Sequence, residues 1–373
     1  MRPCTEMRDA SGNARSPGIF YASIAMPIWD QNVSIHGKKG MSVGYFRFIL
    51  ALIVCSNHLS SFGGAGRYAV FSFYILSGFL MTTILNEKYG LSPSGIGRYA
   101  LNRLLRIYPI YLLALSLAIA SLFYFNNESS VSIEPTFTLP TDSLSWVKNI
   151  LLIGMNFMHM ERVIPPAWTL YVEVSFYMII PLVMLLGRKA IWIWFIGSVA
   201  YHIFLLTSGS YPNFDWNQRY GTVMAGSLGF SLGCLASTYK NRIIISPVAG
   251  LLSLTAIAFI HIFAAWGFGE QVSSIRQFFT SVIFNYLNLV CSSIAVLFLF
   301  SRKESSLSRK TGDFSYPLYL VHIPCCYIVF MASGYQARST YLFLSSMALS
   351  LIVSYLLILV ERRVNVIRRR VKT

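Results

Sequence analysis

The chain has 373 residues, of which 55% are hydrophobic and only 12% are charged. Soluble globular domains average about 25% charged residues, so this composition excludes an ordinary soluble protein and predicts an all-α, polytopic membrane protein. The net charge of +16 would suit a nucleic-acid-binding protein, but the placement of the basic residues favours another explanation, given below.

The first 40 residues are polar and contain one short apolar patch, GIFYASIAMPIW. This patch is too short to span a bilayer and lacks a convincing cleavage site, so we do not predict a signal peptide. We expect a loosely ordered or surface-lying tail over 1–40, a transmembrane domain over 41–363 and a basic tail over 364–373. Met41 directly precedes the first apolar span and is an alternative start of the chain.

Apolar stretches of about 20 residues, the length that crosses a bilayer, occur ten times. The predicted spans are 43–62, 68–86, 107–125, 166–187, 190–207, 220–238, 243–264, 277–300, 314–333 and 341–360. We expect these helices to surround a central cavity or tunnel. The apolar piece 146–158 is too short to cross and is predicted to be re-entrant or interfacial. Glycines dilute the span 220–238 and predict close helix packing there.

Basic residues gather on alternate connections between the spans. With the N-terminus inside, 23 of the 30 Lys and Arg residues are cytoplasmic, six lie outside and Arg47 lies within a span. This asymmetry follows the positive-inside rule, so the basic excess reports topology and gives little support to nucleic-acid binding. We expect a multi-pass protein of a bacterial inner membrane with both termini in the cytoplasm. The longest outer loop, NNESSVSIEPTFTLPTDSLS, is polar and mildly acidic.

Arg47 and His58 lie eleven residues apart in the first span. Eleven residues turn a helix by about 1100°, so both side chains share one face, about 16 Å apart. Ionisable groups within a bilayer are costly and by default functional. Snorkelling of Arg47 and structural packing of His58 are the alternatives. Histidine can serve as a general base near neutral pH, which suits deprotonation of an alcohol.

The second and third spans carry a small-residue step and an arginine cluster. Ser77 and Gly78, in FSFYILSGFLMT, lie about halfway across. They predict either a helix contact or a place where a slender ligand approaches the backbone. Arg103 and Arg106 stand at the cytoplasmic entrance of the third span, where guanidinium groups suit either lipid phosphates or the phosphates of a soluble cofactor.

Two later spans add a carboxylate and two further polar side chains. Glu173 lies about 10 Å below the start of its span, a depth similar to that expected for His58. A carboxylate there should be protonated or paired, so we predict His58 as its partner. Tyr319 and His322 occupy the inner half of the ninth span, where helix packing is the alternative to a functional role.

Taken in order, these segments resemble the acyltransferase-3 family of integral membrane acyltransferases, which modify polysaccharides, lipids and peptides. The spacing of Arg47 and His58 matches the family's arginine-ten-residues-histidine motif. The other segments that carry the resemblance are FYILSGF (73–79), NRLLRIYP (102–109), AWTLYVEVSFYMIIP (167–181), SYPLYLVHIP (315–324) and the terminal Glu361-Arg362 step. The resemblance covers residues from about 43 to 363, nearly all of the predicted transmembrane domain.

The resemblance implies transfer of an acyl group, usually acetyl, from acetyl-CoA to a hydroxyl, here of a surface or lipid-linked saccharide. The candidate residues are His58 and Glu173 for catalysis, and Arg47, Ser77, Gly78, Arg103, Arg106, Tyr319 and His322 for donor binding. The expected partners are the lipid bilayer, the acyl-CoA and the glycan acceptor, without a metal. A transporter or flippase for lipid-linked sugars is the alternative, although the halves of the chain show no repeat.

Overall fold

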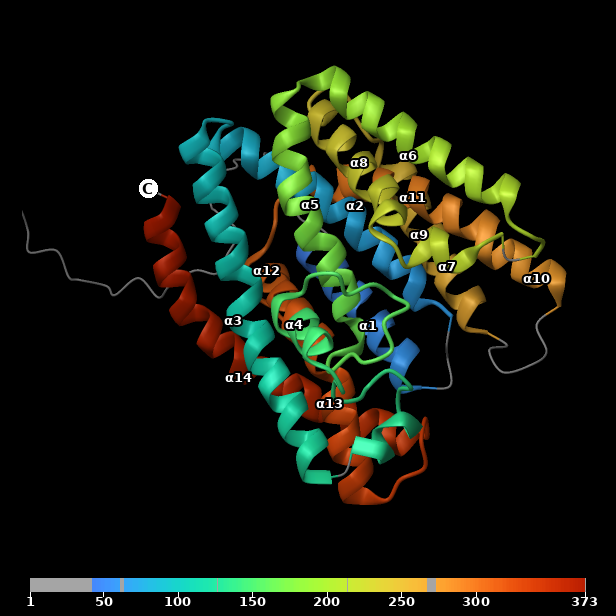
Figure 1. Cartoon of the computed structure of the whole chain (residues 1–373). Coiled ribbons are helices and arrows are strands. Elements are labelled where there is room, and N and C mark those ends of the chain that lie inside the picture. The colour runs from blue at the N-terminus through green and yellow to red at the C-terminus, as the bar shows by residue number, and fades with distance from the viewer. Residues whose placement is uncertain (1–41, 61–63, 126, 213, 267–272, 373) are drawn as a thin grey trace, which may run out of the picture.

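The protein is described by a computed structural model, which covers residues 42–60, 64–125, 127–212, 214–266 and 273–372. The predicted tail over 1–40 lies outside the described residues. Regular structure in the described chain is helical (Figure 1), which confirms the predicted all-α class.

Eight helices of the described chain are long and apolar enough to cross a membrane, and two shorter apolar helices accompany them. The long ones are built on α2 (Gly66–Ile84), α3 (Pro93–Phe125), α5 (Trp168–Leu185), α6 (Arg188–Ser208), α9 (Pro247–Ala265), α11 (Phe284–Phe300), α13 (Ser315–Ser333) and α14 (Thr340–Lys372). The shorter ones are α1 (Val43–Leu59) and α8 (Val223–Tyr239). These ten helices coincide in order with the ten predicted spans. The protein is therefore a multi-pass integral membrane protein.

The central helix is α2, which packs against α1, α5, α8 and α11. Its apolar stretch is 78% buried, more than that of any other long span in the described chain. The closest neighbour is α8, where a Cβ built on Gly233 would lie only 2.1 Å from the carbonyl oxygen of Ile75. The glycines of this span therefore serve close helix packing, as predicted.

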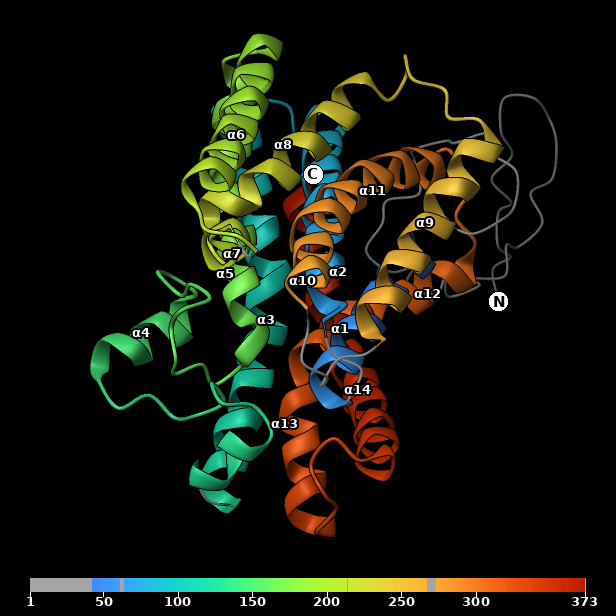
Figure 2. The same cartoon turned by 90° about the vertical axis from the view of Figure 1, so that its right-hand side faces the viewer.

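The bundle has two ends, which we name after the α1 residues nearest to them. At the Arg47 end, α12 (Ser306–Asp313) packs on the start of α1. The amide of Gly44 there donates to Glu304 Oε1 at 3.1 Å. At the His58 end lie the short helices α7 (Trp216–Tyr220) and α10 (Ser274–Phe278), seen in Figure 2.

The apolar piece predicted over 146–158 coincides in part with α4 (Ser143–Leu151), which stands apart from the bundle in Figure 2. Asp142 caps this helix by accepting from the backbone amides of Leu144 and Ser145. Nine residues of helix reach about 14 Å, so α4 is too short to cross a bilayer, as expected.

The last helix extends further than the sequence suggested. α14 remains helical to Lys372, through most of the stretch predicted as a basic tail. Arg368 is buried there, and its guanidinium donates to Asn102 on α3 at 3.0 Å and to Asn365 at 2.7 Å. Because α14 is tied to α3 in this way, these turns pack on the bundle, and the helix continues past residue 363, where the basic tail is predicted to begin.

Candidate functional site

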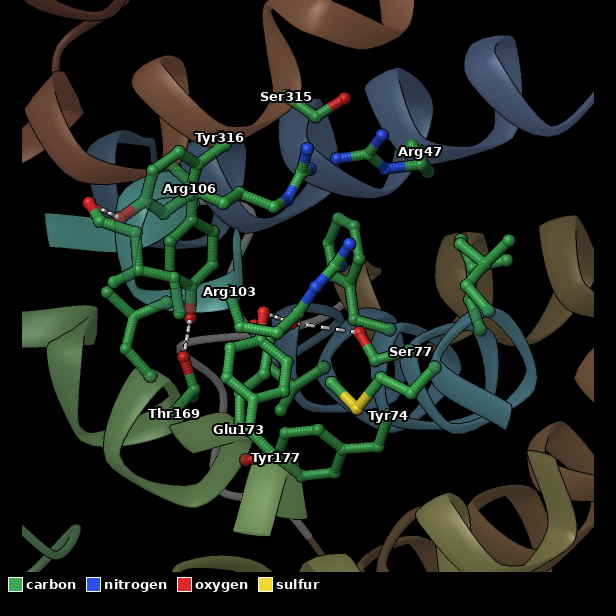
Figure 3. A pocket seen from close by; sticks show the side chains of 18 residues that line it. Arg47, Tyr74, Ser77, Arg103, Arg106, Thr169, Glu173, Tyr177, Ser315 and Tyr316 are labelled. Carbon is green, nitrogen blue, oxygen red and sulfur yellow. Dashed lines mark hydrogen bonds between the residues drawn. The ribbon is translucent and has the colours of Figure 1, made fainter. Parts of the chain in front are cut away.

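A narrow cavity starts at the Arg47 end and is bounded by α1, α2, α3, α5 and α13 (Figure 3). Its volume is about 100 Å³. Its polar lining is formed by Arg47, Tyr74, Ser77, Arg103, Arg106, Thr169, Glu173, Tyr177, Ser315, Tyr316 and Tyr319. The small volume suits a slender chain better than a bulky ring system.

Three arginines from two helices face this cavity, and Figure 3 shows their guanidinium groups turned toward one another. Arg47 and Arg103 are each only 8% exposed. The Arg103 guanidinium lies 5.6 Å from the ring centre of Tyr99 and 5.9 Å from that of Tyr177, which holds it against an aromatic wall. Together with Arg106, these guanidinium groups form a positively charged site of the kind that binds phosphate.

The carboxylate of Glu173 faces the same cavity from α5. Its Oε1 accepts hydrogen bonds from the Tyr177 hydroxyl at 2.9 Å and from Ser77 Oγ at 3.3 Å. Ser77 comes from the middle of α2, so two predicted site residues meet here although 96 positions separate them. These two hydroxyl groups fix the position of the Glu173 carboxyl group in the cavity.

Gly78, next to Ser77, does not border the cavity. A Cβ at this position would lie 2.3 Å from the carbonyl oxygen of Phe230 on α8. The expectation that Gly78 borders a ligand is therefore corrected: its missing side chain lets α2 and α8 approach each other.

The cavity ends at a hydrogen bond between the Thr169 and Tyr319 hydroxyls, 2.7 Å apart. The Tyr319 ring lies 6.3 Å from the ring of His322, which in turn lies 5.4 Å from the ring of His58. Tyr319 thus lines the cavity, and one histidine ring stands between Tyr319 and His58.

His58 has its carboxylate partner in a loop. Its Nδ1 lies 3.2 Å from Oε2 of Glu134, which follows the 3₁₀ turn Asn127–Ser132 and precedes α4. The predicted pairing of His58 with Glu173 is therefore wrong. The reason is depth, because α1 ends one residue after His58, whereas Glu173 lies five residues, or about 7.5 Å, into α5.

The Glu134 carboxylate is held in a short polar network. Its Oε1 accepts from Thr136 Oγ1 at 3.3 Å, and that hydroxyl accepts from Arg162 Nη2 at 3.0 Å. Burial raises the pKa of Glu134, but the hydrogen bond and charge of His58 and the charge of Arg162 outweigh it and leave the pKa below its ordinary value. The His58 and Glu134 side chains are 25% and 19% exposed, so the pair is accessible from the His58 end.

His322 lies beside His58 and is fully buried. Its Nδ1 is 3.2 Å from the carbonyl oxygen of Leu318, and its Nε2 has no hydrogen-bond partner in the part of the chain that the structure describes. His322 is not among the residues that line the cavity, so its predicted place along the donor tunnel is corrected. It fills the space between Tyr319 and the His58–Glu134 pair.

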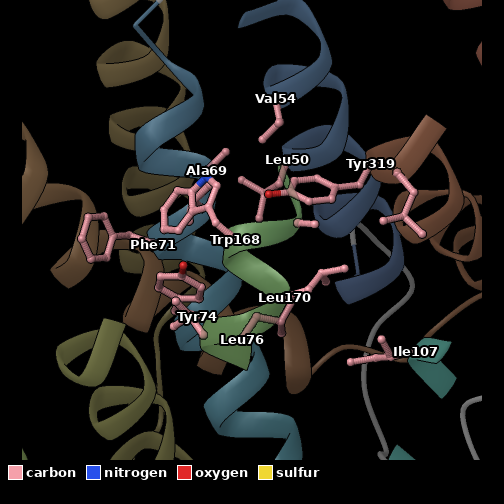
Figure 4. Close-up of a cluster of buried hydrophobic side chains, with 14 of the residues drawn as sticks. Leu50, Val54, Ala69, Phe71, Tyr74, Leu76, Ile107, Trp168, Leu170 and Tyr319 are labelled. Carbon is pink, nitrogen blue, oxygen red and sulfur yellow. The ribbon is translucent and has the colours of Figure 1, made fainter. Parts of the chain in front are cut away.

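The shared face of α1 is closed between Arg47 and His58. Leu50 and Val54 lie on this face, at 0% and 2% exposure. They belong to an apolar cluster that also contains Trp168 and Tyr319 (Figure 4). The expected continuous tunnel is therefore interrupted: the cavity is open from Arg47 to Tyr319, and packed side chains separate it from His58.

The chain was compared with known families, curated proteins and solved structures. The model of the acyltransferase-3 domain matches residues 42–359, which is most of the chain and includes the whole cavity and the His58–Glu134 pair. No curated protein and no solved structure gives a significant match. The chain therefore belongs to the acyltransferase-3 family and is a membrane-embedded acyltransferase.

Proposed function

We propose that the protein transfers an acetyl or other short acyl group from cytoplasmic acyl-CoA to a hydroxyl of a surface or lipid-linked saccharide. The observation that carries this proposal is the succession of three arginines, two of them buried and one half-buried, a narrow cavity, and a histidine–carboxylate pair beyond the far wall of that cavity. Family membership supplies the reaction class, whereas the donor and the acceptor are inferred from the chemistry of the two ends.

The Arg47 end suits the donor. Arg47, Arg103 and Arg106 bind the phosphates of the coenzyme, and its bulky nucleotide stays at the mouth of the cavity. The slender pantetheine arm enters the cavity past Ser77 and brings the thioester toward Thr169. The hydroxyl groups in this stretch can donate hydrogen bonds to the amide and thioester carbonyls of the arm.

The His58 end suits the acceptor. With Nδ1 of His58 hydrogen-bonded to Glu134, Nε2 is the ring nitrogen left to act as the base. Nε2 takes the proton of the acceptor hydroxyl while the hydroxyl oxygen attacks the thioester carbon. The carbon–sulfur bond then breaks, the coenzyme leaves as a thiolate, and His58 returns the proton to it. Glu134 stabilises the imidazolium formed in between, as the carboxylate does in a catalytic triad.

The path from the cavity at the Arg47 end to His58 is closed by packed side chains. The apolar cluster with Leu50, Val54 and Tyr319 separates the cavity from His58 in the described conformation. Acyl transfer therefore requires the Tyr319 side chain to break its hydrogen bond with Thr169 and move, so that the thioester can pass. Until then the packed cluster keeps water away from the thioester.

The charge distribution supports an orientation for this reaction. The positive-inside rule applied to Lys and Arg favours the Arg47 end in the cytoplasm, where acyl-CoA is made, and the His58 end outside. This arrangement fits a bacterial inner membrane, across which an acyl group must pass to reach maturing surface glycans.

The test uses the full chain in lipid nanodiscs, with acetyl-CoA and a saccharide purified from the surface of cells that lack the chain and freed of esters by mild base. Release of coenzyme thiol should depend on the saccharide, and mass spectrometry should find acetylated saccharide. His58→Ala should lower kcat at least about 100-fold. The matched control is His159→Ala, because His159 lies at the same end without contacting the Glu134 carboxylate.

Saccharide movement across the membrane without thiol release would favour a flippase and overturn the proposal. Full transfer by the His58→Ala variant would leave the reaction class intact but remove His58 from the chemistry.

A further inference from the structure

A second, wider hollow lies at the His58 end, between the start of α2, α7 and α10. Measured in the same way as the first cavity, its volume is about 900 Å³. We call it the outer cleft and define it by Arg67, Asp215, Trp216, Gln218, Arg276 and Gln277, which are among its lining residues. The outer cleft is wider and more open than the cavity at the Arg47 end, so it suits a bulkier ligand.

The outer cleft lies close to the His58–Glu134 pair. Gly66, directly before Arg67, donates its amide to Asn57 Oδ1 at 3.2 Å, and Asn57 precedes His58. A second connection begins with aromatic side chains, because Tyr220 packs on both Trp216 and Phe157 at ring distances of 5.2 and 5.4 Å. The carbonyl oxygen of Phe157 accepts from Arg162, which also donates to the Thr136 hydroxyl beside Glu134. A ligand in the outer cleft therefore lies at the same end of the bundle as the proposed base.

The Trp216 ring is presented in a fixed orientation. It stacks on Tyr220 at an angle of 14°, and the guanidinium of Arg67 lies 5.0 Å from the Trp216 ring centre. The fully buried Arg219 holds α7 in place by donating to the carbonyl oxygens of Phe214 at 2.6 Å and Ser281 at 2.9 Å. The aromatic surface is therefore preorganised, which reduces the entropy lost on binding.

The chemistry of the lining indicates the class of ligand. Tyr220 and the guanidinium groups of Arg67 and Arg219 cover the faces of the Trp216 ring, which offers a sugar the apolar edge that lines the cleft. The amides of Gln218 and Gln277 can both donate to and accept from hydroxyl groups. Among the described lining residues, two arginines, Arg67 and Arg276, outnumber the one carboxylate, Asp215, so the cleft also favours an acidic substituent.

We propose that the outer cleft is the acceptor subsite and binds a saccharide chain that carries carboxylate or phosphate groups. This inference rests on the proposed function, which it deepens by assigning the acceptor to Trp216, Arg67 and their neighbours. Acylation would then occur at a sugar near His58, while neighbouring sugars of the same chain occupy the cleft.

The test separates binding from transfer. The probe is the de-esterified surface saccharide described above, labelled at its reducing end and titrated onto the full chain in nanodiscs. Trp216→Ala should weaken its binding about tenfold, and in the transfer assay it should raise KM for the saccharide while KM for acetyl-CoA stays unchanged. Trp192→Ala is the matched control, because Trp192 is an exposed tryptophan on α6 that does not line the cleft.

The arginines provide a second variant in case Trp216→Ala disturbs folding. Arg67→Gln should weaken saccharide binding and reduce its salt dependence, because an ion pair with the acidic group is lost. The control is Arg338→Gln, an exposed arginine in the connection between α13 and α14. Wild-type binding that does not respond to salt would contradict the acidic class of ligand.

The outcomes distinguish this inference from the proposed function. Transfer with an unchanged saccharide KM in both Trp216→Ala and Arg67→Gln would overturn the cleft assignment and leave the acyltransfer proposal standing. Saccharide binding that depends on Trp216 without any acyl transfer would support the cleft and overturn the proposed reaction. A wild-type protein that neither binds nor acylates the saccharide would overturn both.

Discussion

His58 Nδ1 and Glu134 Oε2 lie 3.2 Å apart, although 76 residues separate them and only one of them belongs to a membrane span. The histidine sits one residue before the end of α1, and the carboxylate comes from the loop that follows α3. The pair therefore forms at the edge of the bundle, where solvent and a polar acceptor have access.

Replacing Glu134 by Gln should lower kcat for acyl transfer by at least about tenfold and leave KM for acetyl-CoA unchanged. An amide keeps the shape of the side chain but cannot stabilise a protonated His58, whereas the donor binds elsewhere. Glu161→Gln is the control, because Glu161 is another loop carboxylate and accepts from Thr141 instead. Unchanged kcat in Glu134→Gln would show that His58 works without this partner.

The same carboxylate gives the stability of the fold a pH dependence. The pKa of Glu134 is lower in the folded protein than its ordinary value of 4.5, so the unfolded chain binds this proton more readily. The stabilisation is present at pH values above about 4.5 and is lost as the pH falls through the folded-state pKa. The difference in Tm between the wild type and Glu134→Gln, measured in detergent, should therefore be smaller at about pH 3 than at about pH 5.

A background variant controls this pH experiment. In His58→Ala the hydrogen bond and charge that lower the pKa of Glu134 are absent, so adding Glu134→Gln should change Tm less than it does in the wild type. A Tm difference that stays the same at both pH values would contradict the linkage.

The arginines at the other end predict a dependence on the donor's phosphates. Arg103→Gln should raise KM for acetyl-CoA about tenfold or more, because a buried charge-assisted hydrogen bond to phosphate is lost. KM for acetyl-pantetheine, which lacks the nucleotide and its phosphates, should stay the same. Arg188→Gln serves as control, since Arg188 is exposed at the start of α6. Equal effects on both donors would argue against phosphate binding by Arg103.

The sequence was sufficient to predict the helices and several residues of the cavity at the Arg47 end, because both depend on local patterns, whereas Gly78 and His322 lie outside this cavity. Apolar length predicted the ten spans, and the motif positions of Arg47, Ser77 and Arg103 meet in one cavity. The partner of His58 could not be found in this way. Glu134 lies in a polar loop without periodicity, and its only signal was the mildly acidic character of that loop.

Arg67 and Trp216 of the outer cleft were missed for a related reason. Each lies near a helix terminus at the edge of an apolar span, where an arginine or a tryptophan is common and carries no signal. Only the packing of α2 against α8, which brings the start of α2 near α7, places the Arg67 guanidinium over the Trp216 ring.

Substitution of Gly78 tests the close packing between α2 and α8. This packing fixes the positions of Ser77 and Arg67 on α2. Gly78→Ala should destabilise the fold by about 1–3 kcal/mol, because its Cβ would lie 2.3 Å from the Phe230 carbonyl oxygen and the helices must separate. Gly197→Ala is the matched control on α6, where a Cβ meets no atom within 4 Å. That substitution should be neutral or stabilising by up to about 1 kcal/mol. Tm measured in detergent should therefore fall for Gly78→Ala and stay the same or rise for Gly197→Ala. A Gly78→Ala variant as stable as the wild type would show that this contact leaves room for a side chain.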